Sequence, residues 1–520
     1  MRAEEIHQAL TKMIALNQMP ISFCSSEGFL QFMAIVEPNY KPIKEDALKK
    51  RLHALKESIE KSIKAELNKA CGVACTSDCW SSAAQESYIT MTVHLIDDNW
   101  VQRSFTLDTT EMDKRHTSEN LANKMENIFE EWKLNDKIVA IVTDNAANVV
   151  KAVQSIEQVQ EKSDVTCAAH SLQLAVNNSL YSEDIQLLVT KASKIVGHFK
   201  HSNVAKYALK EKQKQLGLPV LTLLQSCNTR WNSVFLMLER LTQNRSPVMN
   251  VLADREITTG AAAEKLEILE REWIAMENLA RVLEPVQMVT LVLCNEDASA
   301  SMVRPLMEKL LQEHMMSLDS DSEMIRVFKN TLSDGLKWRF DLEWDSELST
   351  VSTRQIASML DPRYKDLDHE SHDAKVVIRD AVKELLKEST LCQDTESEVC
   401  KKQTSLEFLY KKGGNKINKV QNQWEEYLAE PLLKFDMNPY EWWKNRKDKY
   451  PAIALLAKKY LCIPATSVSS ERCFSTAGNI VTFKRTSLLP YNVNMLVFLY
   501  QNRRLLKQEA DVITAVAEKK

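Results

Sequence analysis

The sequence predicts an α/β region near the N-terminus followed by a long helical region. First, 9 Gly and 13 Pro among 520 residues leave few chain breakers, which favours helices. Second, residues 73–144 contain short runs of β-forming residues that are typical of strands. Third, apolar residues recur three and four positions apart through most of residues 160–435. Because single cores stop growing at ~250–300 residues, we expect two or more domains.

The composition excludes several classes of protein. Hydrophobic residues make up 44% of the chain and charged residues 27%, as in an ordinary globular protein. No run approaches the ~18 apolar residues of a membrane span, and residues 1–5 lack the apolar core of a signal peptide. We therefore expect no membrane partner and a location in the cytosol or nucleus. The net charge of -4 argues against indiscriminate binding to nucleic acid, although a local basic face stays open.

The 11 cysteines are an odd number in a chain without secretory features, which favours free thiols over disulfides. Cys71, Cys75 and Cys79 form a cluster that permits either a zinc site or buried thiols. No second CxxC pair and no HxxxH pattern accompanies this cluster.

The first elements follow from the period of the apolar residues. Within residues 1–68 one apolar stripe predicts an amphipathic helix, made of Leu48, Leu52, Leu55, Ile59, Ile63 and Leu67. Residues 73–76 predict a short strand. Residues 88–96 and 100–107 alternate in the manner of strands around a turn at 97–99, which predicts a hairpin. Thr117 or Ser118 then caps a helix with the stripe Leu121, Met125, Ile128 or Phe129, and Trp132.

A second strand type follows. Residues 137–144 are a nearly continuous apolar run, which predicts a strand buried on both faces, and a helix over Val149 to Ile156 comes next. Strand, strand, strand, helix, strand, helix is the order of an α/β layer arrangement. Beyond residue 160 we expect helices, with polar loops at 317–322 and 388–403. The aromatic-rich residues 436–505 end in a helix at 492–499, and a polar tail follows residue 506.

Three carboxylates stand out, each with two interpretations. Asp144 directly follows the buried strand, where it either caps the next helix or holds a ligand at the strand end. Asp78, taken alone, is a turn aspartate before the hairpin, and Glu471 alone is a surface residue of a short helix. Together they supply the oxygen ligands that two Mg²⁺ ions need for phosphodiester chemistry.

The motifs around these residues resemble those of hAT-superfamily DNA transposases over nearly the whole chain. The resemblance rests on six ordered segments: TSDCWSS at 76–82, VTDNAANVVKA at 142–152, CAAH at 167–170, TRW at 229–231, LDPRYK at 360–365 and SSERCFSTAGNI at 469–480. It implies α/β plus all-α architecture, in which an RNase H-like catalytic fold is interrupted by a large helical insertion. Glu471 would return the chain to the active site.

The resemblance also implies a domain organisation and a partner. We expect an N-terminal helical segment at 1–68, RNase H-like parts at 69–160 and 436–507, the insertion at 161–435 and a tail at 508–520. The last RNase H-like part resembles the hAT dimerisation region, so we expect a homodimer or higher assembly. We expect the helix carrying Leu496 and Leu499 to bury its apolar face against a partner or the insertion.

Residue roles follow from the same resemblance. Asp78, Asp144 and Glu471 would bind two Mg²⁺ ions, which makes them the expected catalytic and metal residues. Arg230 would hold a DNA phosphate and Trp231 would stack on a flipped base, although Trp231 also suits a helical core. His170 would orient DNA or a catalytic group, or would be a core histidine.

One departure separates this chain from many hAT proteins. They begin with a BED-type zinc finger, and no CxxC…HxxxH pattern matches one here, while residues 5–40 resemble the helical region that follows the finger. Either the product is truncated or this sequence-reading module has been lost, and the net charge favours the second interpretation. No small-molecule cofactor is expected.

Three functions therefore compete. For the role in the cell, the first hypothesis is a domesticated nuclear protein that dimerises and binds DNA without transposing. The alternative is an active transposase that cuts DNA through the three carboxylates. A metal-dependent hydrolase unrelated to DNA would share the carboxylates but would explain neither Arg230 and Trp231 nor the C-terminal region. Residues 444–449 form a basic cluster that is either a solvated helix face or an import signal.

Overall fold

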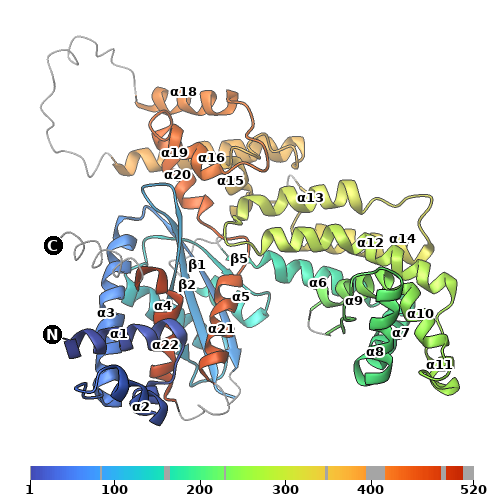
Figure 1. Cartoon of the computed structure of the whole chain (residues 1–520). Helices are drawn as coiled ribbons and strands as arrows, with labels where there is room; N and C mark the ends of the chain where they lie inside the picture. Colours follow the sequence, from blue (N-terminus) through green and yellow to red (C-terminus); the bar gives the residue numbers. More distant parts are fainter. Residues whose placement is uncertain are drawn as a thin grey trace, which may run out of the picture.

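The computed structural model describes residues 2–81, 85–156, 164–227, 230–345, 349–393, 416–481 and 488–506. A central sheet is surrounded by helices at both ends of the sequence, and a helical arm projects to one side (Figure 1). A further group of helices lies across the end of the sheet from which the arm departs (Figure 1). The described part is mostly helical with one small mixed sheet, which agrees with the predicted class.

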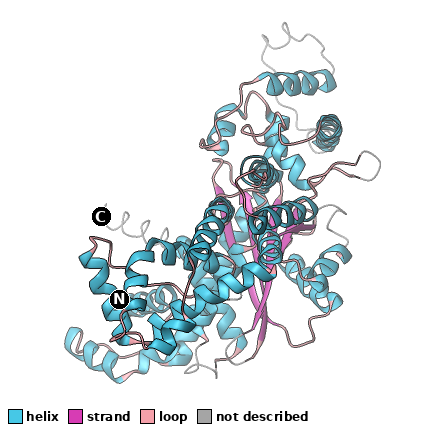
Figure 2. Ribbon diagram, turned by 90° about the vertical axis from the view of Figure 1, so that its right-hand side faces the viewer, coloured by secondary structure: helices cyan, strands magenta, loops and turns pink. Residues whose placement is uncertain are grey.

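The sheet has five strands in the order β3-β2-β1-β4-β5. Strands β1, β2 and β3 pair antiparallel, whereas β4 lies parallel to β1 and β5 lies parallel to β4. Their bounds are β1 (Val73–Ser81), β2 (Ser87–Ile96), β3 (Gln102–Glu111), β4 (Ile138–Thr143) and β5 (Asp164–Thr166). The predicted hairpin and buried strand are confirmed. Figure 2 shows the strands as a narrow layer enclosed by helices.

Two features of the sheet differ from the prediction. Strand β1 continues to Ser81, so Asp78 lies inside a strand and not in a turn. The extension forms because residues 78–81 keep pairing with β2. Strand β5 was not predicted, because its three residues are too few to show a period within a stretch that reads as helical.

Helices from both ends of the chain, together with α4 and α5, cover one face of the sheet. They are α1 (Arg2–Asn17), the 3₁₀ turn η1 (Ile21–Ser25), α2 (Glu27–Val36), α3 (Glu45–Lys69), α4 (Ser118–Trp132), α5 (Ala147–Ser155), α21 (Val468–Ile480) and α22 (Pro490–Gln501). They share one apolar core with Val73 and Cys75 of β1. Thr117 caps α4 by accepting a hydrogen bond from Asn120 N at 3.3 Å, as predicted.

The opposite face of the sheet carries a different core. Ala74 of β1 and Ala140 of β4 face it, as expected for side chains that alternate along a buried strand. Its helices are α15 (Thr353–Leu360), α16 (His372–Gln393), α18 (Lys416–Ala429), α19 (Pro439–Arg446) and α20 (Pro451–Leu461). The predicted boundary at residue 435 falls inside this core. The LDPRYK segment stabilises it, because Lys365 Nζ donates to the carbonyls of Tyr427 and Leu428 at 2.9 and 2.8 Å.

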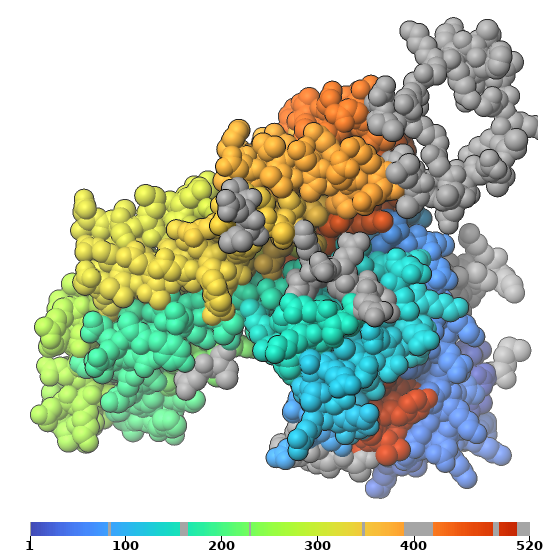
Figure 3. Space-filling model, turned by 180° about the vertical axis from the view of Figure 1, so that it is seen from behind, coloured from blue at the N-terminus to red at the C-terminus, as the bar shows by residue number. Residues whose placement is uncertain are grey.

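The arm has a third core of its own, which is visible as a separate lobe in the space-filling view (Figure 3). It contains α6 (Ala168–Leu180), α7 (Glu183–His201), α8 (Asn203–Gln215), α9 (Asn232–Gln243), α10 (Arg245–Ala253), α11 (Gly260–Lys265), α12 (Glu270–Leu293), α13 (Val303–His314) and α14 (Glu323–Arg339). The 3₁₀ turn η2 (Ala300–Met302) connects α12 to α13. Among the described residues, no helix combines the length and apolar composition needed to cross a membrane.

The predicted loops had mixed outcomes. Residues 317–322 form the loop between α13 and α14, as expected, whereas residues 388–393 belong to α16. Residues 394–403 and the predicted tail beyond residue 506 lie outside the described residues.

The expectation for Leu496 and Leu499 needs correction. Both lie in α22, which fills the first core between the N-terminal helices and the sheet, and their side chains are 2% and 0% exposed. Figure 3 shows the C-terminal residues (red) lying between the N-terminal (blue) and α4 (cyan) surfaces. The helix is apolar on both sides because its own chain surrounds it, so these leucines are not available to a partner in this structure.

This placement predicts that Leu499→Ala lowers the free energy of unfolding by about 2–5 kcal/mol, because it leaves a cavity in a packed core. Urea unfolding followed by circular dichroism measures the change. Leu489→Ala is the control, since Leu489 precedes the same helix but is 67% exposed, and we expect it to change stability by less than about 0.5 kcal/mol. A Leu499→Ala protein that only dissociates, with unchanged stability, would contradict the placement.

Candidate acidic site at the end of strands β1 and β4

Asp78 lies in a buried position on β1. Its side chain is 8% exposed, and its Oδ1 accepts a hydrogen bond from the backbone N of Cys79 at 2.7 Å. Burial, and then the charge of Asp144, raise the pKa of Asp78 to about 7, with a further contribution from Glu471. The Cys79 N–H and the charge of His170 oppose this rise. Asp78 is therefore a carboxyl group poised between its neutral and charged forms.

Asp144 is placed beside Asp78 by the parallel pairing of β1 and β4. Thr76 is paired with Val142, so two residues further along each strand the register brings Asp78 level with Asp144. Neighbouring strands lie about 4.8 Å apart, which accounts for the influence of one carboxylate on the other. Asp144 Oδ1 also accepts from Ala146 N at 3.2 Å, in the turn before α5. Asp144 thus supports the turn into α5 while facing a second carboxylate.

Glu471 comes from the first turn of α21, far along the chain. The preceding residue, Ser470, has its Oγ 2.6 Å from Oγ1 of Thr76, two residues before Asp78 on β1. This contact fixes the start of α21 against the strand. The charge of Glu471 acts on both Asp78 and His170. The structure therefore brings the three predicted carboxylates into one electrostatic neighbourhood.

The donor set has the chemistry that Mg²⁺ prefers, since all three groups offer carboxylate oxygens. The spacing is a separate matter. Within the ranges that the structure describes, no group of three or more His, Cys, Asp or Glu side chains is arranged closely enough to hold a metal ion. The three side chains are of the type that binds a metal ion, but in this conformation they do not form a complete ligand shell.

His170 belongs to the same neighbourhood. It lies in the first turn of α6, three residues after Cys167, whose N donates to Thr143 O at 2.7 Å. The Cys167 side chain, followed by the charges of Glu471 and Asp78, raises the pKa of His170 to about 9 against the opposing effect of burial. Its Nδ1 is buried and has no hydrogen-bond partner in the part of the chain that the structure describes. His170 is therefore a cation that offsets part of the negative charge of the carboxylates beside it.

Cys167 holds this corner together. Burial acts to raise the pKa of its thiol, but His170 outweighs burial and lowers the pKa overall. Its Sγ also accepts a hydrogen bond from Ser467 N at 3.3 Å. The CxxH element thus connects the end of β4, the start of the arm and the segment that leads to Glu471.

Trp231 does not have the exposure that base stacking needs. Its side chain is 2% exposed and is part of the core of the arm, so the expectation of a stacking surface is wrong for this conformation. The apolar helices around it explain the burial. Arg230, in contrast, is exposed, and its charge influences Cys294, which also responds to Glu471 and Cys167. Arg230 and Glu471 therefore both act on Cys294, at the end of α12.

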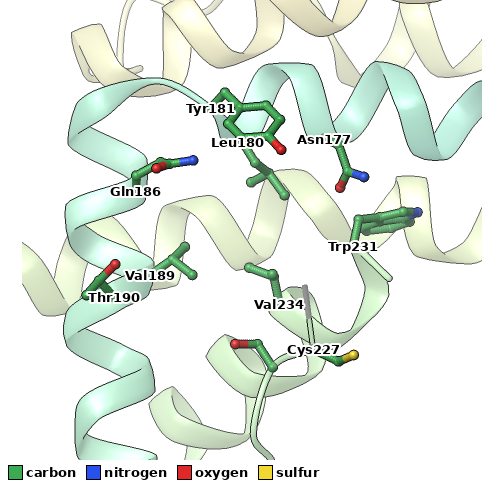
Figure 4. A pocket seen from close by; sticks show the side chains of 10 residues that line it. Asn177, Leu180, Tyr181, Gln186, Val189, Thr190, Cys227, Trp231 and Val234 are labelled. Carbon is green, nitrogen blue, oxygen red and sulfur yellow. The ribbon is translucent and has the colours of Figure 1, made fainter. Parts of the chain in front are cut away.

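A pocket of 370 Å³ lies against Trp231, and sequence reasoning did not identify it (Figure 4). Its walls come from the end of α6, the first half of α7, the segment before α9 and the first turn of α9: Asn177, Leu180, Tyr181, Gln186, Val189, Thr190, Ser226, Cys227, Trp231 and Val234. Tyr181 is 71% exposed at its rim. Polar residues at helical spacing look like ordinary surface in a sequence, so no signal marked this hollow.

Three family models match parts of the chain. Residues 76–171 match the ZBED1 RNase-like domain, residues 165–282 match the ZBED1 RNase-like helical domain, and residues 423–503 match the hAT family C-terminal dimerisation region. The first match begins in β1 and contains both aspartates. The last contains Glu471.

Curated relatives agree with these matches. The chain is 24% identical to zinc finger BED domain-containing protein 4 of Homo sapiens over 97% of its own length and 44% of the relative. It is 25% identical to a putative AC transposase of Zea mays, with 91% and 62% covered. It is 22% identical to the putative transcriptional regulator tpeD of Talaromyces stipitatus, with 94% and 61% covered. The chain thus spans between 44% and 62% of the length of these relatives.

The raised pKa of Asp78 predicts a pH-dependent stability. In the unfolded chain the carboxyl loses its proton near pH 4, whereas in the folded chain it does so near pH 7. The folded state therefore binds more protons between these values, and this contribution to stability is lost as the pH rises toward 7. Asp78→Asn is expected to remove up to about 3 kcal/mol of the change in unfolding free energy between pH 5 and pH 7.5.

Urea unfolding at the two pH values measures this difference. Asp113→Asn serves as the control, because Asp113 is an exposed aspartate in the loop before α4. His170, with its pKa of about 9, contributes a further loss only above pH 6.5. Equal pH dependence in the wild type and Asp78→Asn would show that Asp78 titrates normally.

Proposed function

We propose that this chain, a hAT-like protein, binds DNA in the nucleus as a self-associated assembly built around the site of Asp78, Asp144 and Glu471. The observation that carries the proposal is the convergence of two aspartates from adjacent strands and a glutamate from the matched C-terminal region. A cationic His170 belongs to the same site, and the exposed Arg230 acts on Cys294 together with Glu471. The relatives named as transposases and as a transcriptional regulator support a nuclear role.

The order and direction of the strands support an RNase H-like fold. Three antiparallel strands continue into two parallel ones, and the aspartates lie on β1 and directly after β4. The chain leaves this sheet after β5 and comes back to it at α21. Such a path is consistent with a catalytic fold interrupted by a helical insertion.

A second candidate activity is metal-dependent DNA cleavage and strand transfer. The raised pKa of Asp78 favours this activity, because a bound cation relieves the repulsion between neighbouring carboxylates. Mg²⁺ bound there would supply a Lewis acid for phosphodiester chemistry. Asp78, Asp144 and Glu471 would hold it, and His170 would present a proton donor and a positive charge to the DNA backbone. Glu471 would need to approach the aspartates for this activity.

We assign the contacts with DNA to side chains that are exposed. Arg230 offers an exposed guanidinium to a phosphate next to the acidic site. At the pocket beside Trp231, Tyr181 is the exposed aromatic ring, with the amides of Asn177 and Gln186 nearby (Figure 4). We therefore assign base stacking to Tyr181, with Trp231 as a supporting wall.

The matched dimerisation region supports self-association, and its exposed apolar side chains indicate the contact surface. Between α18 and α19 the chain exposes Leu432, Phe435 and Met437 by 43%, 81% and 51%. The intervening Leu433 is anchored, since its N donates to Pro362 O at 3.0 Å. A loop fixed in this way presents its apolar side chains at little entropic cost, so we assign it to contact with a second copy of this chain.

Binding and cleavage are separated by one pair of experiments. Purified protein is titrated with duplex DNA in a fluorescence anisotropy assay, and a supercoiled plasmid is incubated with it in Mg²⁺ or Mn²⁺. We expect duplex binding by the wild type and by Asp144→Asn. Nicking by the wild type that disappears in Asp144→Asn would assign the cleavage activity, and equal nicking by both would place cleavage outside this site. Absence of duplex binding contradicts the proposed function.

The exposed loop gives a test of self-association. Phe435→Glu places a charge in the proposed contact and is expected to weaken self-association at least tenfold, measured by sedimentation velocity across a concentration series. Tyr207→Glu is the matched control, because Tyr207 is 68% exposed on α8 in the arm. If Phe435→Glu associates like the wild type, the contact lies elsewhere.

A further inference from the structure

A polar pocket lies on the other side of α21 from the acidic site. It has a volume of 160 Å³ between the β2–β3 hairpin, the segment after α12 and the ends of α21 and α22. Its lining consists of Thr92, His94, Gln102, Arg103, Ser104, Thr106, Glu296, Asp297, Ser469, Arg472, Gln501, Arg503 and Arg504. We infer that this pocket binds a phosphate group.

The charge of the lining favours an anion. Four arginines line the pocket and two carboxylates, Glu296 and Asp297, accompany them. Arg472 and Arg504 both contact Glu296, so two guanidinium groups share one carboxylate. A phosphate offers several oxygens to such groups, and the planar guanidinium fork binds two of them at once.

The other two arginines differ in their engagement. Arg103 pairs with Asp97 at the hairpin turn at 2.9 Å. Arg503 lies over the ring of Tyr500 and donates to the Tyr500 carbonyl at 3.0 Å, and it has no carboxylate partner within the described ranges. Arg503 is therefore the cation with the most unused hydrogen-bonding capacity in the pocket.

The side-chain amide of Gln102 gives an independent indication that the pocket binds a ligand. Both its Oε1 and its Nε2 are buried and lack hydrogen-bond partners among the described residues. Buried polar groups in folded proteins are nearly always satisfied, and a pocket-lining amide without partners has the hydrogen-bonding capacity that a phosphate group would use. The Gln102 amide can donate to a phosphate oxygen and accept from a protonated one.

The size and the floor of the pocket restrict its ligand. A volume of 160 Å³ suits a phosphate and its first hydration shell better than a large organic molecule. His94 at the floor is 3% exposed and hydrogen-bonds to Thr92 Oγ1 at 2.9 Å. Burial lowers its pKa to about 4, so it adds hydrogen bonding and no charge at neutral pH. The cations are therefore confined to the arginine rim.

The pocket is connected to the acidic site through α21. Ser469 and Arg472 are three residues apart, so they share the helix face that lines the pocket, whereas Glu471 influences Asp78 on the other side. A chain of buried hydroxyl contacts also crosses the sheet. It runs from Ser470 to Thr76 at 2.6 Å, from Thr76 to Thr92 at 2.6 Å, and on to His94. A phosphate held here supports the position of Glu471 without touching it.

The phosphate has two sources, a free phosphate ion or the backbone of bound DNA. The full chain is first titrated with inorganic phosphate by isothermal calorimetry at constant ionic strength, with chloride as the replaced anion. DNA affinity is then measured over a series of salt concentrations. Both measurements are made for the wild type, Arg503→Gln and Arg504→Gln. Arg326→Gln is the matched control, because it removes an equal charge from an exposed position on α14.

We expect Arg503→Gln to weaken phosphate binding at least tenfold, while Arg326→Gln leaves it unchanged. If the source is DNA, each pocket variant reduces the slope of log K against log salt by about 0.9. Arg504 has an 86% exposed side chain, so its variant tests the pocket even if Arg503→Gln misfolds. The assignment is overturned if phosphate still binds after both substitutions. It is also overturned if the wild type binds no phosphate and the slope of log K against log salt for DNA is the same in the wild type and the variants.

The outcome is separable from that of the proposed function. The inferred phosphate site involves DNA only if the phosphate belongs to the DNA backbone. The titration with inorganic phosphate tests the site even if the chain binds no DNA. Conversely, if the chain binds DNA with unchanged slopes and binds no phosphate, the phosphate site is rejected and the proposed function still stands.

Discussion

The position of Glu471 depends on a short buried segment, residues 463–467, which passes between the arm and the sheet. Ala300 N donates to Ile463 O at 2.8 Å, and Ala465 N donates to Ala298 O at 2.9 Å. Ala465 O in turn accepts from Ala168 N at 3.1 Å, at the start of α6. Four residues after Ile463 the backbone of Ser467 reaches the thiol of Cys167. Two separate parts of the helical region therefore hold the segment before α21 begins.

This constraint explains how a small sheet can maintain an unfavourable site. Crowding carboxylates around a buried Asp78 costs free energy, and the raised pKa is its measure. The opposing contribution comes from apolar packing, because β1 and β4 are buried between the first and third cores. Additional polar contacts fix the C-terminal helices, since Asn502 donates to Thr106 O and accepts from Thr106 N at 2.9 and 3.2 Å. The stability of the scaffold thus lies away from the site that it positions.

The sequence was a good guide to elements and a poorer guide to exposure. Periodicity located α3 and the hairpin, and a continuous apolar run located β4, because each has enough residues to show its pattern. The helix predicted at 492–499 corresponds to α22. The motifs located Asp78, Asp144 and Glu471, and the parallel register then explains how the two aspartates meet. Burial depends on contacts far along the chain, so Leu496 and Trp231 were misjudged. The two pockets gave no signal because their linings combine residues from distant segments.

The electrostatics of the site are compatible with the proposed binding of DNA by a chain of net charge -4. Near pH 7 the buried Asp78 is only partly ionised, while His170 carries its proton up to about pH 9. A phosphate that approaches the site then meets fewer negative charges than three ionised carboxylates would present, and the positive charge of His170 offsets part of them. As the pH rises, Asp78 gains its charge first and His170 loses its own later. Both changes make the site more negative, so the proposed binding of DNA at this site is expected to weaken as the pH rises.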